Sequence, residues 1–114
     1  MNGFFAAGCA AMFAVVAAGA FGAHALKSRL TPEMLAVWET AVRYMAYHGL
    51  ALLLVGRMPQ SRVAGWCFTL GIVVFSGSLF LLALTGKKWL GAITPLGGLA
   101  FLAGWLSLLL SSRP

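Results

Sequence analysis

The stretch "GFFAAGCAAMFAVVAAGAFGAHAL", residues 3–26, contains no charged side chain, and the first charge that follows it is Lys27. About 20 apolar residues cross the hydrocarbon core of a bilayer as an α-helix. The run is longer than the apolar core of a secretory signal, and no Lys or Arg precedes it. It therefore predicts a transmembrane helix.

The composition of the whole chain agrees with a membrane protein. Of its 114 residues, 61% are hydrophobic and only 9% are charged, whereas about 25% of the residues in soluble proteins are charged. A domain of this length buries a smaller share of its surface than a larger one does. We expect lipid to cover much of the apolar surface, and the length allows one domain.

The charge of +6 comes from eight basic residues and two acidic ones, Glu33 and Glu39. The basic residues are scattered between apolar runs and form no patch interleaved with aromatic residues. Binding to nucleic acid needs clustered Lys and Arg on one face, so we expect none. Cations that flank apolar runs are typical of contact with lipid head groups, and membrane lipid is the expected partner.

Three further helices follow from turn signals and apolar runs. Thr31 is a candidate N-cap, Pro32 suits the first helical position, and Glu33 complements the helix dipole. The segment "RMPQSR", residues 57–62, interrupts the pattern. Since backbone groups in lipid must be satisfied within the chain, we predict an all-α fold, a single integral membrane four-helix bundle over residues 1–114 with helices at about 3–26, 32–56, 63–85 and 90–111.

The charges do not decide the orientation of this bundle in the membrane. Cytoplasmic loops usually carry the excess of Lys and Arg. One side of the predicted bundle carries four cations and the other three, which are Lys27, Arg29, Lys87 and Lys88 against Arg57, Arg62 and Arg113.

The second helix has an amphipathic N-terminal half. In "WETAVRYMAYHGLALL", residues 38–53, two neighbouring polar rows follow the helical spacing of four residues. One row contains Glu39, Arg43 and Tyr47. The other contains Thr40, Tyr44 and His48.

Two interpretations of this polar half remain open. The Glu39–Arg43 pair either lies in the head-group layer or forms an ion pair inside the bundle. His48 is either held by hydrogen bonds or acts in a proton relay. Two histidines alone are a weak signal for haem, so no metal or cofactor is expected. We predict a polar cluster that joins the first two helices, formed by His24, Glu39, Arg43, Tyr44 and His48.

Small and hydroxylated residues predict close helix packing. Ala18 with Gly22, and Gly19 with Ala23, have the small-xxx-small spacing that lets backbones approach. Pro95 either kinks the last helix or starts its regular part with Thr94 as cap. Packing within the chain and a homo-oligomer face both remain open for the candidate packing residues Gly19, Gly22, Ser76, Gly77, Ser78, Thr94, Pro95, Gly97 and Gly98.

Four segments in order resemble the YgdD-like family, small four-span bacterial inner-membrane proteins of unknown function. They are "GAFGAHAL" at 19–26, "WETAVRYMAYHGLALL" at 38–53, "VFSGSLFLLAL" at 74–84 and "ITPLGGLAFLAGW" at 93–105. The resemblance implies a multi-pass protein of the cytoplasmic membrane with both termini in the cytoplasm. It implies no chemistry. Met45 and Phe80 depart from the family, which often has Gln and Tyr there.

We therefore expect a non-enzymatic protein with a structural or accessory role in the membrane, whose protein partner the sequence does not identify. The alternative is a small proton-coupled transporter or a lipophilic-ligand-binding protein. Size and span number match the small multidrug exporters. Those exporters rely on an acidic residue in their first helix, and the first helix here has none.

Overall fold

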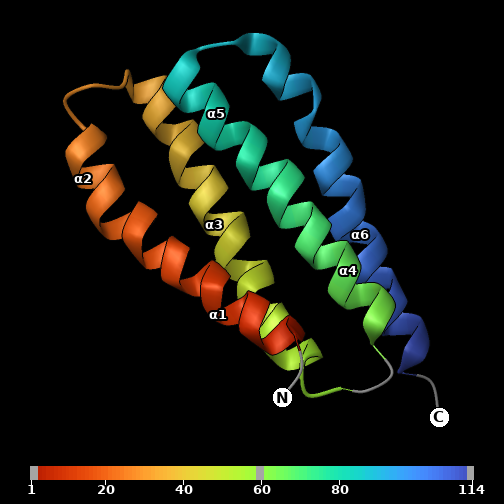
Figure 1. Cartoon of the computed structure of the whole chain (residues 1–114). Coiled ribbons are helices and arrows are strands. Elements are labelled where there is room, and N and C mark those ends of the chain that lie inside the picture. The colour runs from red at the N-terminus through yellow and green to blue at the C-terminus, as the bar shows by residue number, and fades with distance from the viewer. Residues whose placement is uncertain (1–2, 59–60, 113–114) are drawn as a thin grey trace.

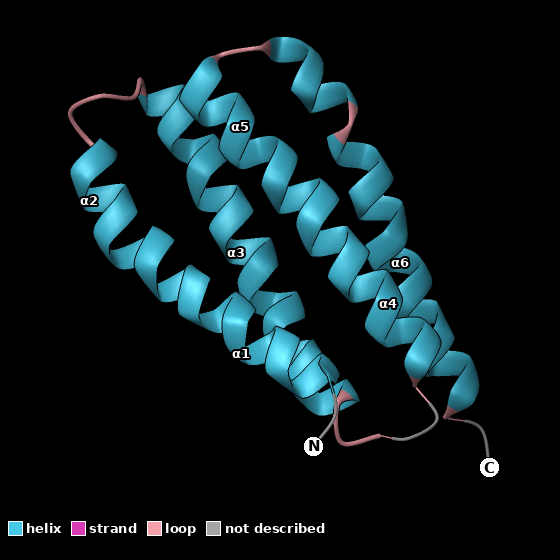
Figure 2. Ribbon diagram, viewed as in Figure 1, coloured by secondary structure: helices cyan, strands magenta, loops and turns pink. Residues whose placement is uncertain are grey.

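A computed structural model describes residues 3–58 and 61–112, which form four long helices and no strand (Figures 1 and 2). Arg113, one of the cations counted above, lies outside the described residues. The bounds lie close to the predicted ranges. The first helix comprises α1 (Gly3–Val16), the π-helical η1 (Ala17–Gly22) and α2 (Ala23–Leu26); the second is α3 (Pro32–Val55); the third comprises α4 (Arg62–Gly71), the π-helical η2 (Ile72–Ser76) and α5 (Gly77–Thr85); the fourth comprises the 3₁₀-helical η3 (Lys88–Ala92) and α6 (Thr94–Ser111).

Within the described part of the chain, three helices are long and apolar enough to cross a membrane: Gly3–Leu26, Arg62–Thr85 and Lys88–Ser111. The helix α3 has the same length of 24 residues, but it is not one of these three because its N-terminal half is polar. The four predicted helices are thus present, and three of them are candidate spans by length and composition.

The start of α3 confirms the predicted cap. The Thr31 hydroxyl accepts a hydrogen bond of 3.1 Å from the Met34 N–H, and Pro32 stands at the first helical position. The amphipathic pattern also appears in the burial of α3, where Ala41 and Met45 are buried while Glu39 and Arg43 are exposed.

The four helices lie side by side in chain order, and α3 packs between the first helix and the third. The last helix packs on α4 and η2. Figure 1 shows the start of α1, the connection after α3 and the end of α6 at one end of the molecule. The connections after α2 and after α5 lie at the other end.

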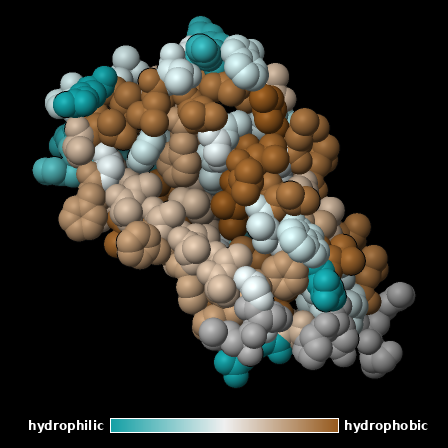
Figure 3. Space-filling model, viewed as in Figure 1, coloured by the Kyte–Doolittle hydropathy of each residue, from teal (hydrophilic) through white to brown (hydrophobic). Residues whose placement is uncertain are grey.

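The surface is mostly apolar between two more polar ends. In the view of Figure 3, hydrophilic residues gather near both ends of the molecule and apolar side chains cover most of the face between them. Large apolar side chains are exposed on all four helices, for example Phe13, Leu54, Val73 and Leu106. Such a surface suits a lipid environment, because lipid contact removes the cost of exposing it to water.

Glycines bring the first helix against α3. A Cβ atom on Gly8 would lie 2.8 Å from the Gly49 carbonyl oxygen, and one on Gly22 would lie 2.9 Å from Cζ2 of Trp38. One on Gly19 would lie 3.2 Å from Cγ1 of Val42. Gly19 and Gly22, two of the predicted packing residues, therefore face a helix of their own chain.

The predicted packing residues of the third and fourth helices behave differently from one another. Gly97 packs directly against the backbone of Phe75, whereas Gly98 has only the Phe75 ring within 4 Å. Nothing lies within 4 Å of a Cβ placed on Gly77. The hydroxyls of Ser78 and Thr94 hydrogen-bond to each other across these two helices.

Pro95 lies at the beginning of α6, so it starts the regular part of the last helix. The predicted cap at Thr94 is wrong, because Ile93 occupies the N-cap position and no side chain caps the helix. The Thr94 hydroxyl instead donates to the Leu90 carbonyl and pairs with Ser78. It therefore joins two helices rather than capping one.

The Gly8–Gly49 contact generates a stability prediction. We expect Gly8→Ala to lower the free energy of unfolding in detergent by about 1–3 kcal/mol, because its Cβ meets backbone atoms that cannot move aside easily. The matched control is Gly77→Ala, which meets open space and gains about 1 kcal/mol of helix propensity. Equal effects of the two substitutions in a thermal unfolding series would contradict this packing.

Candidate functional site

One hydrogen bond joins α3 to each of the other three helices. The Trp38 indole N–H donates to the Ala18 carbonyl at 2.9 Å. The Ser76 hydroxyl donates to the Ala41 carbonyl at 2.7 Å, and Ser76 is buried. The Trp105 indole N–H donates to Nε2 of His48 at 3.0 Å. The second helix, α3, is therefore hydrogen-bonded to each of the other three helices.

The bond from Trp38 falls on the π-helical part of the first helix, where the Ala18 carbonyl also accepts from the Ala23 N–H. Gly22 leaves the space that the Trp38 ring fills. The same ring meets Phe80 of α5 edge-on, with centroids 4.6 Å apart. Irregular turns of this kind often mark places where a side chain inserts against a helix. Trp38 thus contacts the first and third helices at once.

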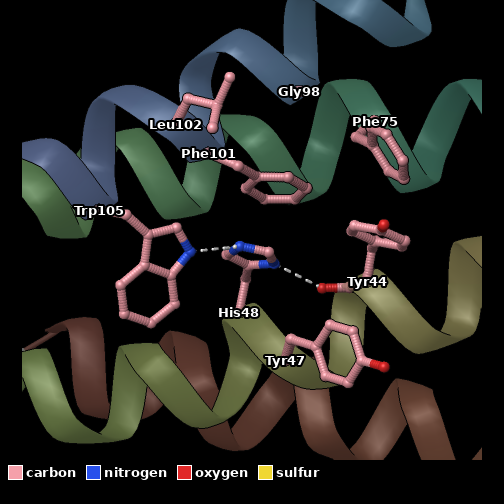
Figure 4. A pocket seen from close by; sticks show the side chains of 8 residues that line it. All are labelled: Tyr44, Tyr47, His48, Phe75, Gly98, Phe101, Leu102 and Trp105. Atoms are coloured by element: carbon pink, nitrogen blue, oxygen red, sulfur yellow. Dashed lines mark hydrogen bonds between the residues drawn. The ribbon is translucent and has the colours of Figure 1, made fainter.

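His48 lies between α3 and α6 and is 4% exposed. Its Nδ1 is 2.8 Å from the Tyr44 carbonyl oxygen. A carbonyl oxygen only accepts hydrogen bonds, so Nδ1 carries the hydrogen, and Nε2 is the acceptor for Trp105. Figure 4 shows the imidazole between these two partners. The partners therefore assign a neutral ring with one defined tautomer.

This arrangement limits what His48 can do chemically. Protonation of Nε2 would set an N–H against the Trp105 N–H and break their hydrogen bond. A metal ion or a haem iron could reach Nε2 only by displacing Trp105. Among the described residues no group of three His, Cys, Asp or Glu side chains could hold a metal ion. The geometry of His48 therefore suits a structural role better than acid–base or metal chemistry.

A groove of about 420 Å³ lies beside His48, between α3 and α6. The His48 ring stacks on Phe101, with ring centroids 3.5 Å apart and planes 6° apart. Leu102, at the rim, is 66% exposed, and Tyr47 is 53% exposed. The wall is thus largely aromatic and apolar, and its lining residues are Tyr44, Tyr47, His48, Phe75, Gly98, Phe101, Leu102 and Trp105.

The structure does not bring the five residues of the predicted polar cluster together. Only Tyr44 and His48 are neighbours, and they face the groove toward α6 rather than the first helix. His24, Glu39 and Arg43 are exposed. In the part of the chain that the structure describes, no ion pair joins Glu39 to Arg43 and no hydrogen bond involves the His24 side chain.

Of the groove residues on α6, the sequence-based prediction contains Gly98, as a packing residue, but not Phe101, Leu102 or Trp105. Trp105 falls near the end of a span, where an indole commonly contacts the membrane interface, yet its N–H turns inward to His48. Gly98, Phe101, Leu102 and Trp105 follow the spacing of three and four residues of a helix, so they share one face of α6. That spacing was the available signal for a face directed at α3.

Four helices, three of them able to span a membrane, and an apolar surface between polar ends define a helical membrane protein. The comparisons with known proteins agree. Residues 18–98 match the family described as "Protein of unknown function (DUF423)". A UPF0382 membrane protein of Staphylococcus haemolyticus is 51% identical over 102 residues, 85% of this chain and 84% of the relative.

The UPF0382 membrane protein YwdK of Bacillus subtilis is 42% identical over 104 residues, 85% of both chains. No solved structure matches the chain. The chain thus belongs to the DUF423, or UPF0382, family of membrane proteins, whose function is unknown, and a bacterial membrane is its location.

The hydrogen bond between Trp105 and His48 can be tested by substitution. We expect Trp105→Phe to destabilise the protein by about 1–3 kcal/mol, because Nε2 of His48 is left without a donor in a buried position. In a double-mutant cycle with His48→Phe, the two changes are expected to be coupled by about 1 kcal/mol. Equilibrium unfolding in mixed detergent measures both quantities.

The control is Trp89→Phe, at an exposed tryptophan whose indole makes no hydrogen bond and no ring contact in the described part of the chain. We expect it to change stability by less than about 0.5 kcal/mol. A coupling near zero between positions 48 and 105 would show that the bond contributes nothing to folding.

Proposed function

We propose that the protein crosses the bacterial cytoplasmic membrane four times and, without enzymatic activity, binds the apolar chain of a lipophilic molecule in the groove between α3 and α6. The observation that carries the proposal is the groove itself, with its aromatic wall and its exposed rim. Its role would be accessory, to hold or present such a molecule within the bilayer. Its expected partner is membrane lipid, and we expect it to bind no nucleic acid.

The position of α3 supports a fourth span. It has the same length as the candidate spans on either side and packs against both of them. A helix enclosed by two membrane-crossing neighbours of equal length extends over the same depth of the bilayer. The resemblance to the YgdD-like four-span proteins supports the same arrangement, and we propose that the two families are related.

The groove has the chemistry of a site for an apolar ligand. Its volume of about 420 Å³ falls within the roughly 300–1,000 Å³ that is usual for small-molecule sites. The nitrogens of His48 are both engaged, so they offer no free donor or acceptor to a ligand. The hydroxyls of Tyr44 and Tyr47 hydrogen-bond to no described residue and are free to contact a weakly polar atom.

The alternatives have less support. A proton-coupled transporter would need a group that gains and loses a proton beside its substrate, and His48 is held neutral by two hydrogen bonds. The carboxyl of Glu39 lies outside the groove lining. The groove also lacks the paired nucleophile and base that a covalent catalyst uses. Binding without chemistry therefore explains the lining residues best.

Filling the groove tests the proposal. A larger side chain at Gly98 projects into the groove, because only the Phe75 ring lies within 4 Å of its Cβ position. In proteoliposomes with a diazirine-bearing fatty acid, we expect photolabelling of the groove residues and a loss of at least threefold in Gly98→Leu. The labelled residues are identified by mass spectrometry.

Leu99→Phe, which adds bulk at the neighbouring exposed position, is the control and should retain full labelling. Thermal unfolding of both variants separates loss of binding from loss of folding. Labelling spread evenly over the exposed apolar residues of all four helices would mean that the groove is no binding site.

The orientation is a separate proposal, with both termini in the cytoplasm as the resemblance implies. Single cysteines at Arg29, Arg57 and Ser112 in a cysteine-free background report the side of each connection through a membrane-impermeant maleimide. We expect Arg29→Cys to react in intact spheroplasts, and Arg57→Cys and Ser112→Cys to react only in inverted vesicles. If all three positions react from the opposite sides, the orientation is reversed. If Arg29→Cys and Arg57→Cys react from the same side, α3 does not cross the membrane and the arrangement of four spans is wrong.

A further inference from the structure

An exposed side of α3, which borders the groove at Tyr47, carries an ordered stripe of side chains. Glu39 and Arg43 are exposed, and more than half of the surface of Tyr47, Leu50 and Leu54 is exposed as well. Their spacing of four, four, three and four residues places them along one line of an α-helix. We name these five residues the outer face of α3.

Hydrogen bonds to the neighbouring helices fix the depth of the two charges. Trp38 bonds to Ala18 and Ala41 bonds to Ser76, and both partners lie well inside apolar helices, Gly3–Leu26 and Arg62–Thr85. At 1.5 Å per residue, Arg43 lies about 16 Å from the start of α3, and half of the hydrocarbon core is about 15 Å. In the four-span arrangement, on which this inference rests, the two charges therefore lie deep in the bilayer.

An exposed charge at this depth needs a partner. Insertion of a charged side chain at the centre of a spanning helix costs about 2.5–3.5 kcal/mol on experimental scales. Within the part of the chain that the structure describes, neither Glu39 nor Arg43 forms an ion pair, although they are one helical turn apart. Charges supplied from outside the described part of the chain would compensate both of them.

We propose that the outer face of α3 binds the same face of a second copy of this chain, so that Glu39 of each copy pairs with Arg43 of the other. A two-fold axis along the membrane normal sets identical residues at the same level. Glu39 and Arg43 are about 6 Å apart along the helix, a distance that a long arginine side chain spans. Both charges on each copy are then neutralised by one kind of partner.

The apolar half of the stripe continues the same contact. Leu50 and Leu54 lie one and two turns beyond Tyr47 and are each more than half exposed, while Ala46 between Arg43 and Leu50 is small enough for close approach. A lipid phosphate is a poorer match for this face. It would pair with Arg43 alone, leave Glu39 unpaired, and have to leave the head-group layer.

Charge reversal with two tagged chains tests the pairing between copies. We expect Glu39→Arg and Arg43→Glu chains each to lose self-association, because each then presents two like charges. When co-expressed with different tags they should co-purify at least fivefold above either chain paired with itself, since opposite charges meet only in the mixed dimer. A pair within one helix predicts no such preference, because each chain still carries two like charges.

Cysteine cross-linking keeps the proposal testable if the reversed chains fail to insert. In a background with Cys9 and Cys67 replaced by serine, Leu50→Cys should form a disulfide-linked dimer in native membranes under mild oxidation. Leu106→Cys on α6 has similar exposure and should remain monomeric. Equal cross-linking at both positions, or none at position 50, overturns the proposal.

The failure of the dimer and the failure of the proposed function have different signatures. Maleimide labelling tests the four spans, and photolabelling with the Gly98→Leu variant tests the groove, without reference to a second copy. If both succeed while the mixed chains do not co-purify and position 50 does not cross-link, only the dimer is wrong. If position 57 labels from the same side as position 29, α3 does not cross the membrane and the premise of a buried Arg43 fails first.

Discussion

The structure depends on hydrogen bonds that three apolar helices form with the most polar one. In lipid, apolar side chains gain little by leaving one helix surface for another, so polar bonds and close backbone contacts must select the partners. Here α3 donates one such hydrogen bond, from Trp38, and accepts two, at Ala41 and His48. Glycines such as Gly8 and Gly49 then allow the backbones to meet. The polarity that excludes α3 from the candidate spans is the same property that makes it the centre of the fold.

The groove follows from how the last of these bonds is formed. His48 bonds directly to Trp105, and two aromatic rings lie next to this bond: Phe101 stacks on the imidazole and Phe75 of η2 lies beside Tyr44. The stacked rings of His48 and Phe101 separate the backbones of α3 and α6, while the hydrogen bond joins the two helices. A space lined by ring faces and edges remains between them, open at Leu102. Trp105→Phe removes the hydrogen bond in the groove wall, whereas Gly98→Leu reduces the groove volume. The two substitutions therefore perturb different properties of the same site.

Much of the helical framework could be predicted from local signals, whereas the site could not. The uncharged run at 3–26 and the Thr31 cap are properties of short segments, and the structure has both. The two polar rows of α3 were also predictable from a spacing of four residues. Which row faces inward was not, because that choice depends on Phe101 and Trp105, more than 50 residues away. The π-helical turn at Ala18 is equally non-local, since the Trp38 ring occupies the space beside it.

The two rows divide the polar residues of α3 by physical role. In the row that faces the groove, the His48 ring is satisfied within the chain, by a backbone carbonyl and an indole. The row of Glu39 and Arg43 has no partner in the described chain, although the two residues carry opposite charges. Opposite charges at one-turn spacing allow a surface to complement a copy of itself, which charges of a single sign do not. The face of α3 that contains His48 therefore holds the chain together, and the adjacent face with Glu39 and Arg43 has the charge pattern of a surface that could bind a second copy.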